Sequence, residues 1–356
     1  MWAKEDMRLR PTVIDIAREA GVSLATVDRV LNERPGVREK TILAVSDAIT
    51  KLGYVRDLAA ANLARQRNYR MAFVLPDTKS QFVQTLRAEL ATAAVVAMAA
   101  RTEIDVISFP AEDPHALAAL LMDLPEKGIS GVALMAPETP ILRDAIKALR
   151  LCGVAVVALV SDLPNTERDR FVGIDNRAAG RTSAVLMGRF LGQGPQKVAV
   201  VAQSMLLRES VERRFGFDDV MGRDFPLVEV LPTLESHGSP DLLRQVVGEM
   251  LGQFSNVGGI YLLGSGHRAL TRAVDDLGLA GRLVVIGHEL TPHARDALIE
   301  GKMDAVITQN VGHLVRSALR VLRAKTDKSP IDAGQEQLRI EIVLRENLPL
   351  GQADVG

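Results

Sequence analysis

The stretch Thr12–Asn32 reads TVIDIAREAGVSLATVDRVLN, and this pattern predicts two short amphipathic helices joined by a tight turn. Thr12 can cap the first helix, with Asp15 three residues later in a variant of the capping box. Gly21 is expected to end that helix, because glycine enters the left-handed backbone region without steric cost. Ser23 can then cap the second helix.

The apolar positions predict which face of each helix is buried. The inward residues of the first helix are Ile14, Ala17 and Ala20, and those of the second helix, Leu24–Leu31, are Val27, Val30 and Leu31. The residues left on the outside are Leu24, Ala25, Thr26, Asp28, Arg29 and Asn32. This is the helix-turn-helix layout, whose second helix enters the DNA major groove. A helical hairpin packed inside a larger domain gives the same pattern.

A third helix strengthens the DNA-binding interpretation. Residues Glu39–Leu52 carry an apolar stripe made of Ile42, Val45, Ile49 and Leu52, and Gly53 follows. A unit of three helices then stands at the N-terminal end, as a small DNA-reading head would.

These residues resemble the LacI/GalR family of bacterial transcription regulators. The segments that carry the resemblance are Ile16–Ser23, Ala25–Val27, Arg29–Asn32, Val37, Leu52–Tyr54 and Ala60–Ala64. A weaker likeness to a periplasmic-binding-protein-like sensor extends over nearly all of the remaining chain. Two positions depart from the family pattern: Asp28 stands where the family usually has a serine that meets a phosphate, and Arg38 stands where it usually has serine.

The resemblance implies roles for the residues of the head. Leu24, Ala25 and Arg29 would read base edges, with Arg29 suited to guanine. Thr26 and Asn32 would contact phosphates, and the set of DNA-binding positions is completed by Thr12, Ser23 and Asp28. The alanine-rich segment that follows would be a hinge helix, marginal by itself, with Ala60 and Leu63 in the minor groove and Leu63 wedged between base steps. Without the head, this segment would be taken for a linker helix.

The composition limits the classes of protein to which this chain can belong. The chain has 356 residues, enough for two or three domains, and a net charge of −1. Residues 1–70 carry 13 Lys+Arg against 9 Asp+Glu, and the rest carries 30 against 35, so a basic head joins an acidic body. The single cysteine, Cys152, lies in an apolar run and is expected to be a buried, inert thiol. We expect no signal peptide, no membrane span and a cytoplasmic location.

From Arg70 onward, continuous apolar strands alternate with helices, which predicts parallel sheets covered on both faces. The predicted class is α/β: a helical head (1–56), a hinge (57–69) and a body (70–356) of two doubly wound subdomains with a ligand cleft. The resemblance divides the body into an N-subdomain, about 70–173 and 308–331, and a C-subdomain, about 174–307 and 332–350. Ligands of such sheets bind at the carboxyl ends of the strands.

The resemblance also implies an effector site in that cleft. Arg213 matches an arginine that contacts sugar hydroxyls or carboxylates, and a guanidinium offers a rigid fork of donors for such groups. The other matching positions are Gln309, Ser161, Asp162, Gln81 and Phe82. For each of these residues, a surface salt bridge or core packing is the alternative.

One family feature is missing from the cleft. After the strand Ile260–Leu263, the usual Asn-Asp is replaced by Gly-Ser-Gly-His, so Ser265 or His267 would take its place. The effector is therefore expected to differ from a simple neutral hexose and to be a phosphorylated or acidic sugar, a polyol or a cyclitol.

The sequence shows no P-loop, no G-x-S-x-G elbow and no H-E-x-x-H, so neither a catalytic residue, a metal nor a cofactor is predicted. We expect a dimeric repressor that binds a pseudo-palindromic operator and is controlled by a sugar-like effector. Two alternatives remain at this point: an α/β enzyme with a fused DNA-binding head, and a sensor whose head has lost DNA binding, as Asp28 suggests.

Overall fold

The computed structural model describes residues 11–31, 35–52, 54, 68–192, 194 and 196–349. The chain forms two compact units, residues 1–67 and residues 68–356, which we call the head and the body. Each unit is described by itself.

The head contains three helices, α1 (Val13–Ala20), α2 (Leu24–Leu31) and α3 (Glu39–Leu52), with the bounds expected from the sequence. The Asp15 carboxylate accepts hydrogen bonds from the backbone N–H (2.8 Å) and hydroxyl (2.7 Å) of Thr12, which satisfies a donor at the start of α1. Gly21 follows α1 with φ of 65°, as its role as a helix stop requires. The Ser23 hydroxyl accepts from the Thr26 N–H at 3.2 Å and caps α2.

The core of the head differs in part from the predicted stripes. Its buried residues are Ile16, Ala17, Val27, Val45 and Ala48. Ile14 and Ile42 were expected to face inward, but they are 54% and 41% exposed. In an α-helix, residues two positions apart point roughly 200° away from each other, so burial of Ile16 turns Ile14 to the outside.

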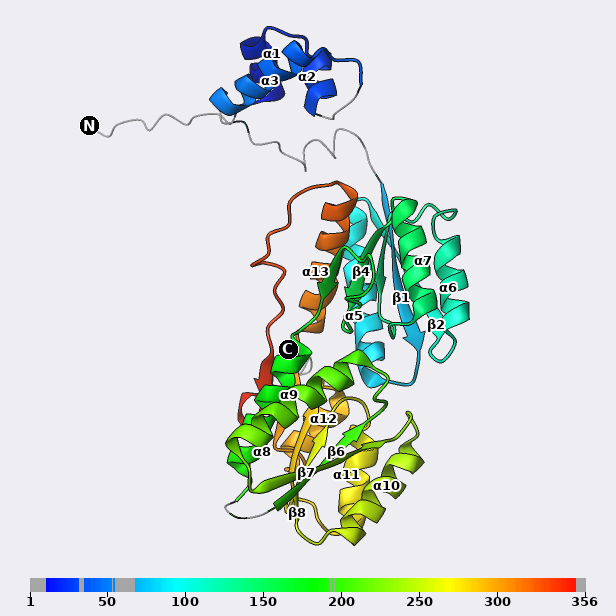
Figure 1. Ribbon diagram of the computed structural model, residues 1–356, viewed down its shortest axis with the longest axis vertical. Helices are drawn as coiled ribbons and strands as arrows, with labels where there is room; N and C mark the ends of the chain where they lie inside the picture. The colour runs from blue at the N-terminus through cyan, green and yellow to red at the C-terminus, as the bar shows by residue number, and fades with distance from the viewer. Residues whose placement is uncertain are drawn as a thin grey trace, which may run out of the picture. The chain divides into compact units, whose positions relative to one another are not determined.

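The body begins with a parallel five-stranded sheet in the order β2-β1-β3-β4-β5. Its strands are β1 (Tyr69–Asp77), β2 (Thr102–Pro110), β3 (Gly131–Leu134), β4 (Ala155–Leu159) and β5 (Arg170–Val172). Helices α6 (Pro114–Asp123) and α7 (Pro140–Leu151) cover one face, and α5 (Gln81–Ala99) and α13 (Val311–Thr326) cover the other (Figure 1). We call this unit the first lobe.

The second lobe has a six-stranded sheet in the order β11-β10-β9-β8-β6-β7. Its strands are β6 (Gln196–Ala202), β7 (Val228–Glu235), β8 (Val257–Leu262), β9 (Val284–His288), β10 (Ala305–Thr308) and β11 (Glu341–Val343). Only the edge strand β11 is antiparallel. The covering helices are α8 (Asn176–Phe190) and α9 (Arg208–Asp224) on one face and α10 (Pro240–Gln253), α11 (His267–Asp276) and α12 (Pro292–Ile299) on the other. The predicted α/β class with two parallel sheets is confirmed.

The chain passes between the two lobes three times. It leaves the first lobe after β5, returns after β10 to form α13, and leaves again after α13 to form β11. The hydrophobic face beneath α5 and α13 continues into the face beneath α8 and α9, so one buried cluster spans both lobes.

By length and composition alone, the 19-residue helix α5 could span a membrane, although no such segment was expected from the sequence. However, Phe82, Val83, Leu86 and Leu90 are buried against the first sheet, so the helix is a packed layer of the α/β body.

Cys152 is exposed, and the prediction of a buried thiol is wrong. The apolar run that contains it straddles the end of α7, where Leu151 is 80% exposed, and the buried strand β4 begins only at Ala155.

Candidate functional site

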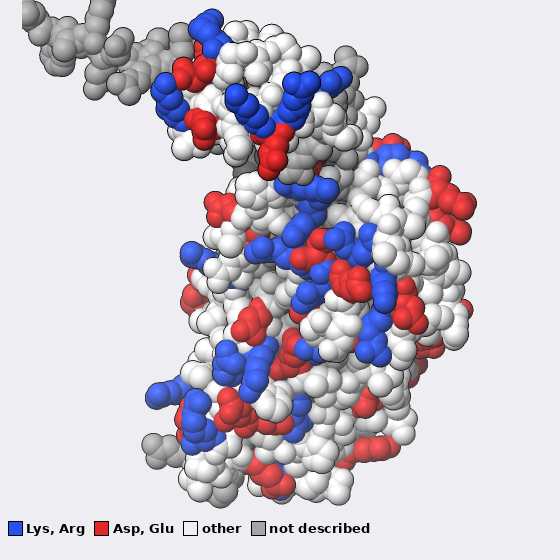
Figure 2. Space-filling model, turned by 45° about the horizontal axis from the view of Figure 1, so that its top comes forward, with Lys and Arg blue, Asp and Glu red and all other residues white. Residues whose placement is uncertain are grey.

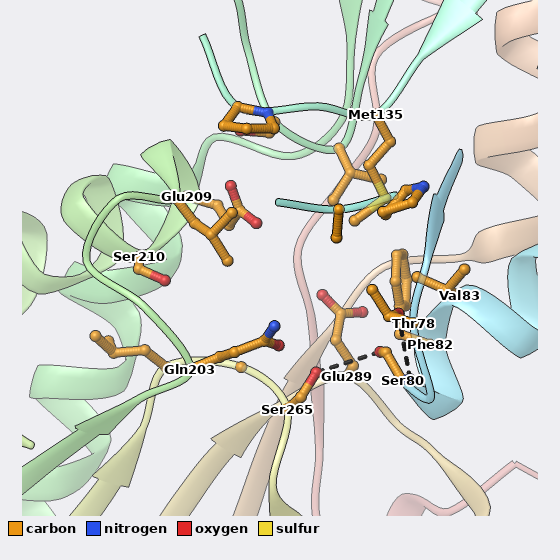
Figure 3. A pocket seen from close by; sticks show the side chains of 18 of the residues that line it. Thr78, Ser80, Phe82, Val83, Met135, Gln203, Glu209, Ser210, Ser265 and Glu289 are labelled. Carbon is orange, nitrogen blue, oxygen red and sulfur yellow. Dashed lines mark hydrogen bonds between the residues drawn. The ribbon is translucent and has the colours of Figure 1, made fainter. Parts of the chain in front are cut away.

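A cavity of about 130 Å³ lies between the two lobes, at the carboxyl ends of the strands. The first lobe contributes residues that follow β1, β2, β3 and β4, and the second lobe contributes residues that follow β6, β8 and β9 (Figure 3). The polar side chains of the lining are Thr78, Ser80, Ser161, Gln203, Glu209, Ser210, Arg213, Ser265 and Glu289. The apolar lining includes Phe82, Val83, Met135, Leu207 and Leu263. An apolar wall with convergent polar groups is typical of a small-molecule site.

Arg213 is the organising residue of this cavity. It is 2% exposed, and its Nε donates to Asn176 Oδ1 at 2.8 Å while Nη1 donates to the Leu263 carbonyl at 2.7 Å. Its Nη2 lies 3.3 Å from Glu289 Oε1, in a buried ion pair. The guanidinium is therefore held in one orientation by α8, by the end of β8 and by the residue after β9.

Close contact between α8 and α9 places Arg213 at this depth. A Cβ added at Gly180 of α8 would lie 2.0 Å from the Arg213 carbonyl oxygen, and one added at Gly216 of α9 would lie 2.1 Å from the Arg177 carbonyl oxygen. Only glycine permits so close an approach of the two backbones.

Glu289 is the second charged residue of the cavity. It follows β9 with φ of 71°, a backbone conformation that side-chain-bearing residues rarely adopt. Burial raises the pKa of its carboxyl, and the neighbouring Arg213 opposes that shift. Rare backbone conformations are often found at ligand sites, and here the carboxylate points into the cavity (Figure 3).

Several buried polar atoms at this site have no hydrogen-bond partner within the protein. They include Ser161 Oγ and Glu209 Oε2 in the cavity. Glu289 Oε2 and the amide of Gln309, which lines an adjoining cavity of about 140 Å³, also lack a well-formed hydrogen bond, although the Gln309 amide lies close enough to Glu289 to oppose the rise in its pKa. Phe82 and Glu289 line both cavities. Because buried polar groups are normally hydrogen-bonded, the atoms that converge on this cavity are available to a ligand or to bound water.

One hydrogen bond joins the two lobes across the cavity. The hydroxyls of Ser80, at the start of α5, and Ser265, after β8, lie 3.2 Å apart (Figure 3). Side chains from both lobes are therefore in direct contact in the lining of the cavity.

The structure brings together most of the residues expected in the effector site. Phe82, Ser161, Arg213 and Ser265 line the main cavity, and Gln309 lines the adjoining one. The three other expected residues, Gln81, Asp162 and His267, line neither cavity.

Asp162 and His267 are engaged elsewhere. Both oxygens of Asp162 accept hydrogen bonds from Arg168, and one also accepts from the Leu163 N–H. His267 begins α11 beneath β9, where the absence of a side chain at Gly287 leaves room for its ring. Burial lowers the pKa of His267 to about 4, so this side chain is neutral near pH 7.

Sequence reasoning missed Glu209 and Glu289. Glu209 lies four residues before Arg213 on α9 and therefore shares its face of the helix, a signal that was available. Glu289 follows a buried strand, but its role depends on a rare backbone conformation that the sequence does not show.

The head presents most of the predicted DNA-binding residues on its surface. Leu24, Ala25, Asp28 and Arg29 of α2 are exposed, while Thr26 is partly buried and its hydroxyl lies 2.9 Å from that of Ser23. Thr12 and Ser23 are exposed at the starts of their helices. The predictions for Asn32, Ala60 and Leu63 lie outside the described residues.

The described part of the head is electrically balanced. Its residues 11–31, 35–52 and 54 contain five Lys+Arg and five Asp+Glu, and Figure 2 shows both signs of charge side by side on its visible face. The excess positive charge of residues 1–70 therefore comes from segments outside the three helices. No group of three or more potential metal ligands occurs within the described residues.

Comparison with known proteins agrees with the division of the chain into a head and a body. Residues 12–57 match the family described as bacterial regulatory proteins, lacI family, and residues 71–329 match the periplasmic binding protein domain. The HTH-type transcriptional regulator RegA of Clostridium saccharobutylicum is 48% identical over 71 residues, which cover 20% of this chain and about a fifth (21%) of RegA. The ribose operon repressor of Halalkalibacterium halodurans is 24% identical over 96% of this chain and 98% of its own length.

Solved structures share the fold of the body. A solute-binding protein of an ABC transporter from Burkholderia graminis, in complex with D-arabinose, has a TM-score of 0.71 and 21% identity over 79% of this chain and 96% of its own. A LacI-type regulator from Bacteroides fragilis has a TM-score of 0.69 and 14% identity over 79% of this chain and 98% of its own. The matched family consists of regulators and not of enzymes. The chain belongs to the lacI family of bacterial regulatory proteins and is a DNA-binding transcriptional regulator with a helix-turn-helix head and a periplasmic-binding-protein-like sensor domain.

Proposed function

We propose that this regulator is a repressor whose cleft binds a small polyhydroxy effector, a sugar or a related compound, and that occupancy of the cleft controls operator binding. The observation that carries the proposal is the set of buried polar atoms of Ser161, Glu209 and Glu289 that lack a well-formed hydrogen bond and converge on the cavity between the lobes. Sugars supply many hydroxyl donors and acceptors for such atoms. The Burkholderia graminis protein of the same fold is in complex with D-arabinose.

In this proposal the effector touches both lobes at once. Phe82 and Ser161 come from the first lobe, and Arg213 and Ser265 come from the second. A ligand that binds one relative orientation of the lobes more tightly stabilises that orientation, and the change is passed to the head through the segment 57–69. Gln309 would contact the same ligand, or an extension of it, from the adjoining cavity.

We propose that α2 reads the operator. Its exposed Leu24, Ala25 and Arg29 would contact base edges, and Thr26 would contact a phosphate. Thr12, Ser23, Asn32, Ala60 and Leu63 remain predicted DNA contacts. An exposed Asp28 would accept from a cytosine amino group or pair with a neighbouring arginine. A protein that acts on bacterial operators works in the cytoplasm.

We also propose a homodimer formed through the body. A single helix-turn-helix unit reads one half-site, and two copies are needed for a pseudo-palindromic operator. The surface that supports this proposal combines the end of α5, where Val95, Val96 and Met98 are 74%, 72% and 72% exposed, with Val106 on the adjacent edge strand β2. Apolar side chains clustered in this way are typical of a subunit interface.

The test is a gel shift with the DNA upstream of the protein's own gene, with and without sugars and polyols. We expect specific binding that a subset of these compounds weakens. Arg213→Ala should retain DNA binding and lose the response to the effector. Ser161→Ala should weaken the response without a loss of stability, because its hydroxyl has no partner to lose.

Arg223→Ala is the matched control for Arg213→Ala, since Arg223 lies at the exposed end of the same helix and pairs only with its neighbour Asp224 among the contacts described. It should bind and respond as the wild type does. Parallel loss of DNA binding and effector response in Arg213→Ala, while the protein stays folded, would contradict the proposed separation of roles.

A further inference from the structure

We propose that the effector carries a protonated amine as well as hydroxyl groups, and that the amine binds Glu209. The inference rests on the proposed function, because it takes the cavity between the lobes as the effector site. It identifies the chemical class of that effector from the charge that lines the cavity.

The charges of the ionisable side chains that line the cavity do not cancel. These side chains are Glu209, Arg213 and Glu289, two acids and one base, which leave a net charge of −1. Arg213 and Glu289 form an ion pair, so the excess negative charge belongs to Glu209.

Glu209 is buried in the first turn of α9, where the helix N-terminus favours its negative charge, but it forms no ion pair among the contacts of the described residues. It is 8% exposed, and its Oε2 atom has no hydrogen-bond partner. Arg213, on the same face of α9, is paired with Glu289, and the sequence neighbour Arg208 pairs with Glu212 at 2.8 Å. A buried carboxylate without a partner is costly, and a cation in the cavity removes that cost most effectively.

The rest of the lining suits the remainder of such a ligand. The Gln203 amide and the carboxylates of Glu209 and Glu289 face the same space (Figure 3). The hydroxyls of Ser161 and Ser210 and the Oε2 atom of Glu289 can bind ligand hydroxyls. Phe82 and Met135 offer an apolar wall for the carbon face of a ring or chain.

This charge balance argues against one expectation drawn from the sequence. A phosphorylated or acidic sugar would bring further negative charge next to Glu209 and Glu289, while Arg213 is already paired. Burial is the main cause of the raised pKa of Glu289, and the nearby Glu209 carboxylate adds to the shift, so the two acids lie close enough to influence each other. An amine corrects the excess of negative charge, whereas an acid increases it.

The experiment is calorimetric titration of the full chain with matched sets of probes at a pH where the amines are protonated. The sets are D-glucose, D-glucosamine and D-glucuronate; D-glucitol, 1-amino-1-deoxy-D-glucitol and D-gluconate; and inositol with its monoamino derivative. On the scaffold that fits, we expect the amino probe to bind about tenfold or more tightly than its neutral partner, as a hydrogen bond to a charged group implies. A neutral or acidic probe that binds as tightly as its amino partner, or a failure of every amino probe to bind, overturns the proposal.

Two variants assign the effect to one carboxylate. Glu209→Gln keeps the size of the side chain and should abolish the preference for the amine without lowering stability, because the atom it changes has no partner. Glu212→Gln, one turn away on the same helix and outside the lining, should keep the preference. A Glu209→Gln variant that still prefers the amine would overturn the assignment.

A gel shift in parallel separates this inference from the proposed function. Operator release by neutral sugars alone would refute the amine and leave the function intact. Binding of an amino probe in the cleft with no effect on operator binding would support the amine and refute the function.

Discussion

Alanine at Gly180 is the sharpest test of how Arg213 is positioned. The new Cβ would lie 2.0 Å from the Arg213 carbonyl oxygen, whereas ordinary contact begins at 3.4 Å, so α8 and α9 must separate locally by about 1.4 Å. A backbone carbonyl cannot turn away as a side chain can. Overpacking of this kind costs about 1–3 kcal/mol of folding free energy.

The same separation should weaken effector binding. The 2.8 Å hydrogen bond from Arg213 Nε to Asn176 joins α9 to α8, and a displacement of this size breaks it. Loss of one charge-assisted hydrogen bond corresponds to about tenfold or more in affinity. Gly180→Ala should therefore lose both stability and effector affinity, although residue 180 does not line the cavity.

Gly222→Ala is the matched control, because it lies on α9 with no atom within 4 Å of its added Cβ. There, alanine should stabilise the helix by up to about 1 kcal/mol through its higher propensity. Urea denaturation followed by circular dichroism measures both variants, and calorimetric titration measures the affinity. A Gly180→Ala protein as stable as Gly222→Ala would refute the argument that the two backbones touch.

Three further predictions concern the head, the pH dependence and the dimer. Ile16→Ala should destabilise the head by about 2–5 kcal/mol and abolish operator binding in a gel shift, whereas Ile14→Ala, at a 54% exposed position, should do neither. Burial lowers the pKa of His267 from 6.5 to about 4, so the unfolded chain takes up the proton at a higher pH than the folded protein does. The free energy of unfolding should therefore decrease by up to about 3 kcal/mol as the pH is lowered from about 6.5 to 4. His267→Gln should reduce this dependence of stability on pH in denaturation curves. Replacement of Val95 and Met98 by glutamate should yield monomers in analytical ultracentrifugation, and an unchanged dimer would refute the proposed interface.

The elements of the fold were predictable because their signals are local. Gly21 and Ser23 mark the turn between α1 and α2 by backbone preference and capping, and the structure has both helices at the expected residues. The family resemblance placed Ser161 and Ser265 near a cleft, and both line the cavity at the carboxyl ends of the parallel strands.

What the sequence could not show depends on which side chains meet in the folded chain, on the rotation of a helix or on a rare backbone conformation. Asp162 follows a strand as a ligand-binding aspartate would, yet Arg168, six residues later, takes both of its oxygens. Ile14 and Ile16 are equally apolar, and only packing against Val27 and Val45 decides which of them is buried. Glu289 reaches the cavity through a left-handed backbone conformation, which a sequence normally signals by a glycine and does not signal here.

The position of Gln309 suggests how occupancy of the cleft could be converted into movement of the lobes. It lies between β10 of the second lobe and α13 of the first, and the next residue, Asn310, caps α13 by accepting from the His313 N–H at 2.7 Å. Its amide is buried near Glu289 without a well-formed hydrogen bond, so a ligand that bonds to it acts directly on a segment that crosses between the lobes. In the proposed mechanism, that contact changes the start of α13, which packs on the sheet that leads to the head through β1. An effector that reaches Gln309 should therefore alter operator binding more strongly than one confined to the main cavity, and Gln309→Ala should remove that difference while leaving the weaker ligand's affinity unchanged.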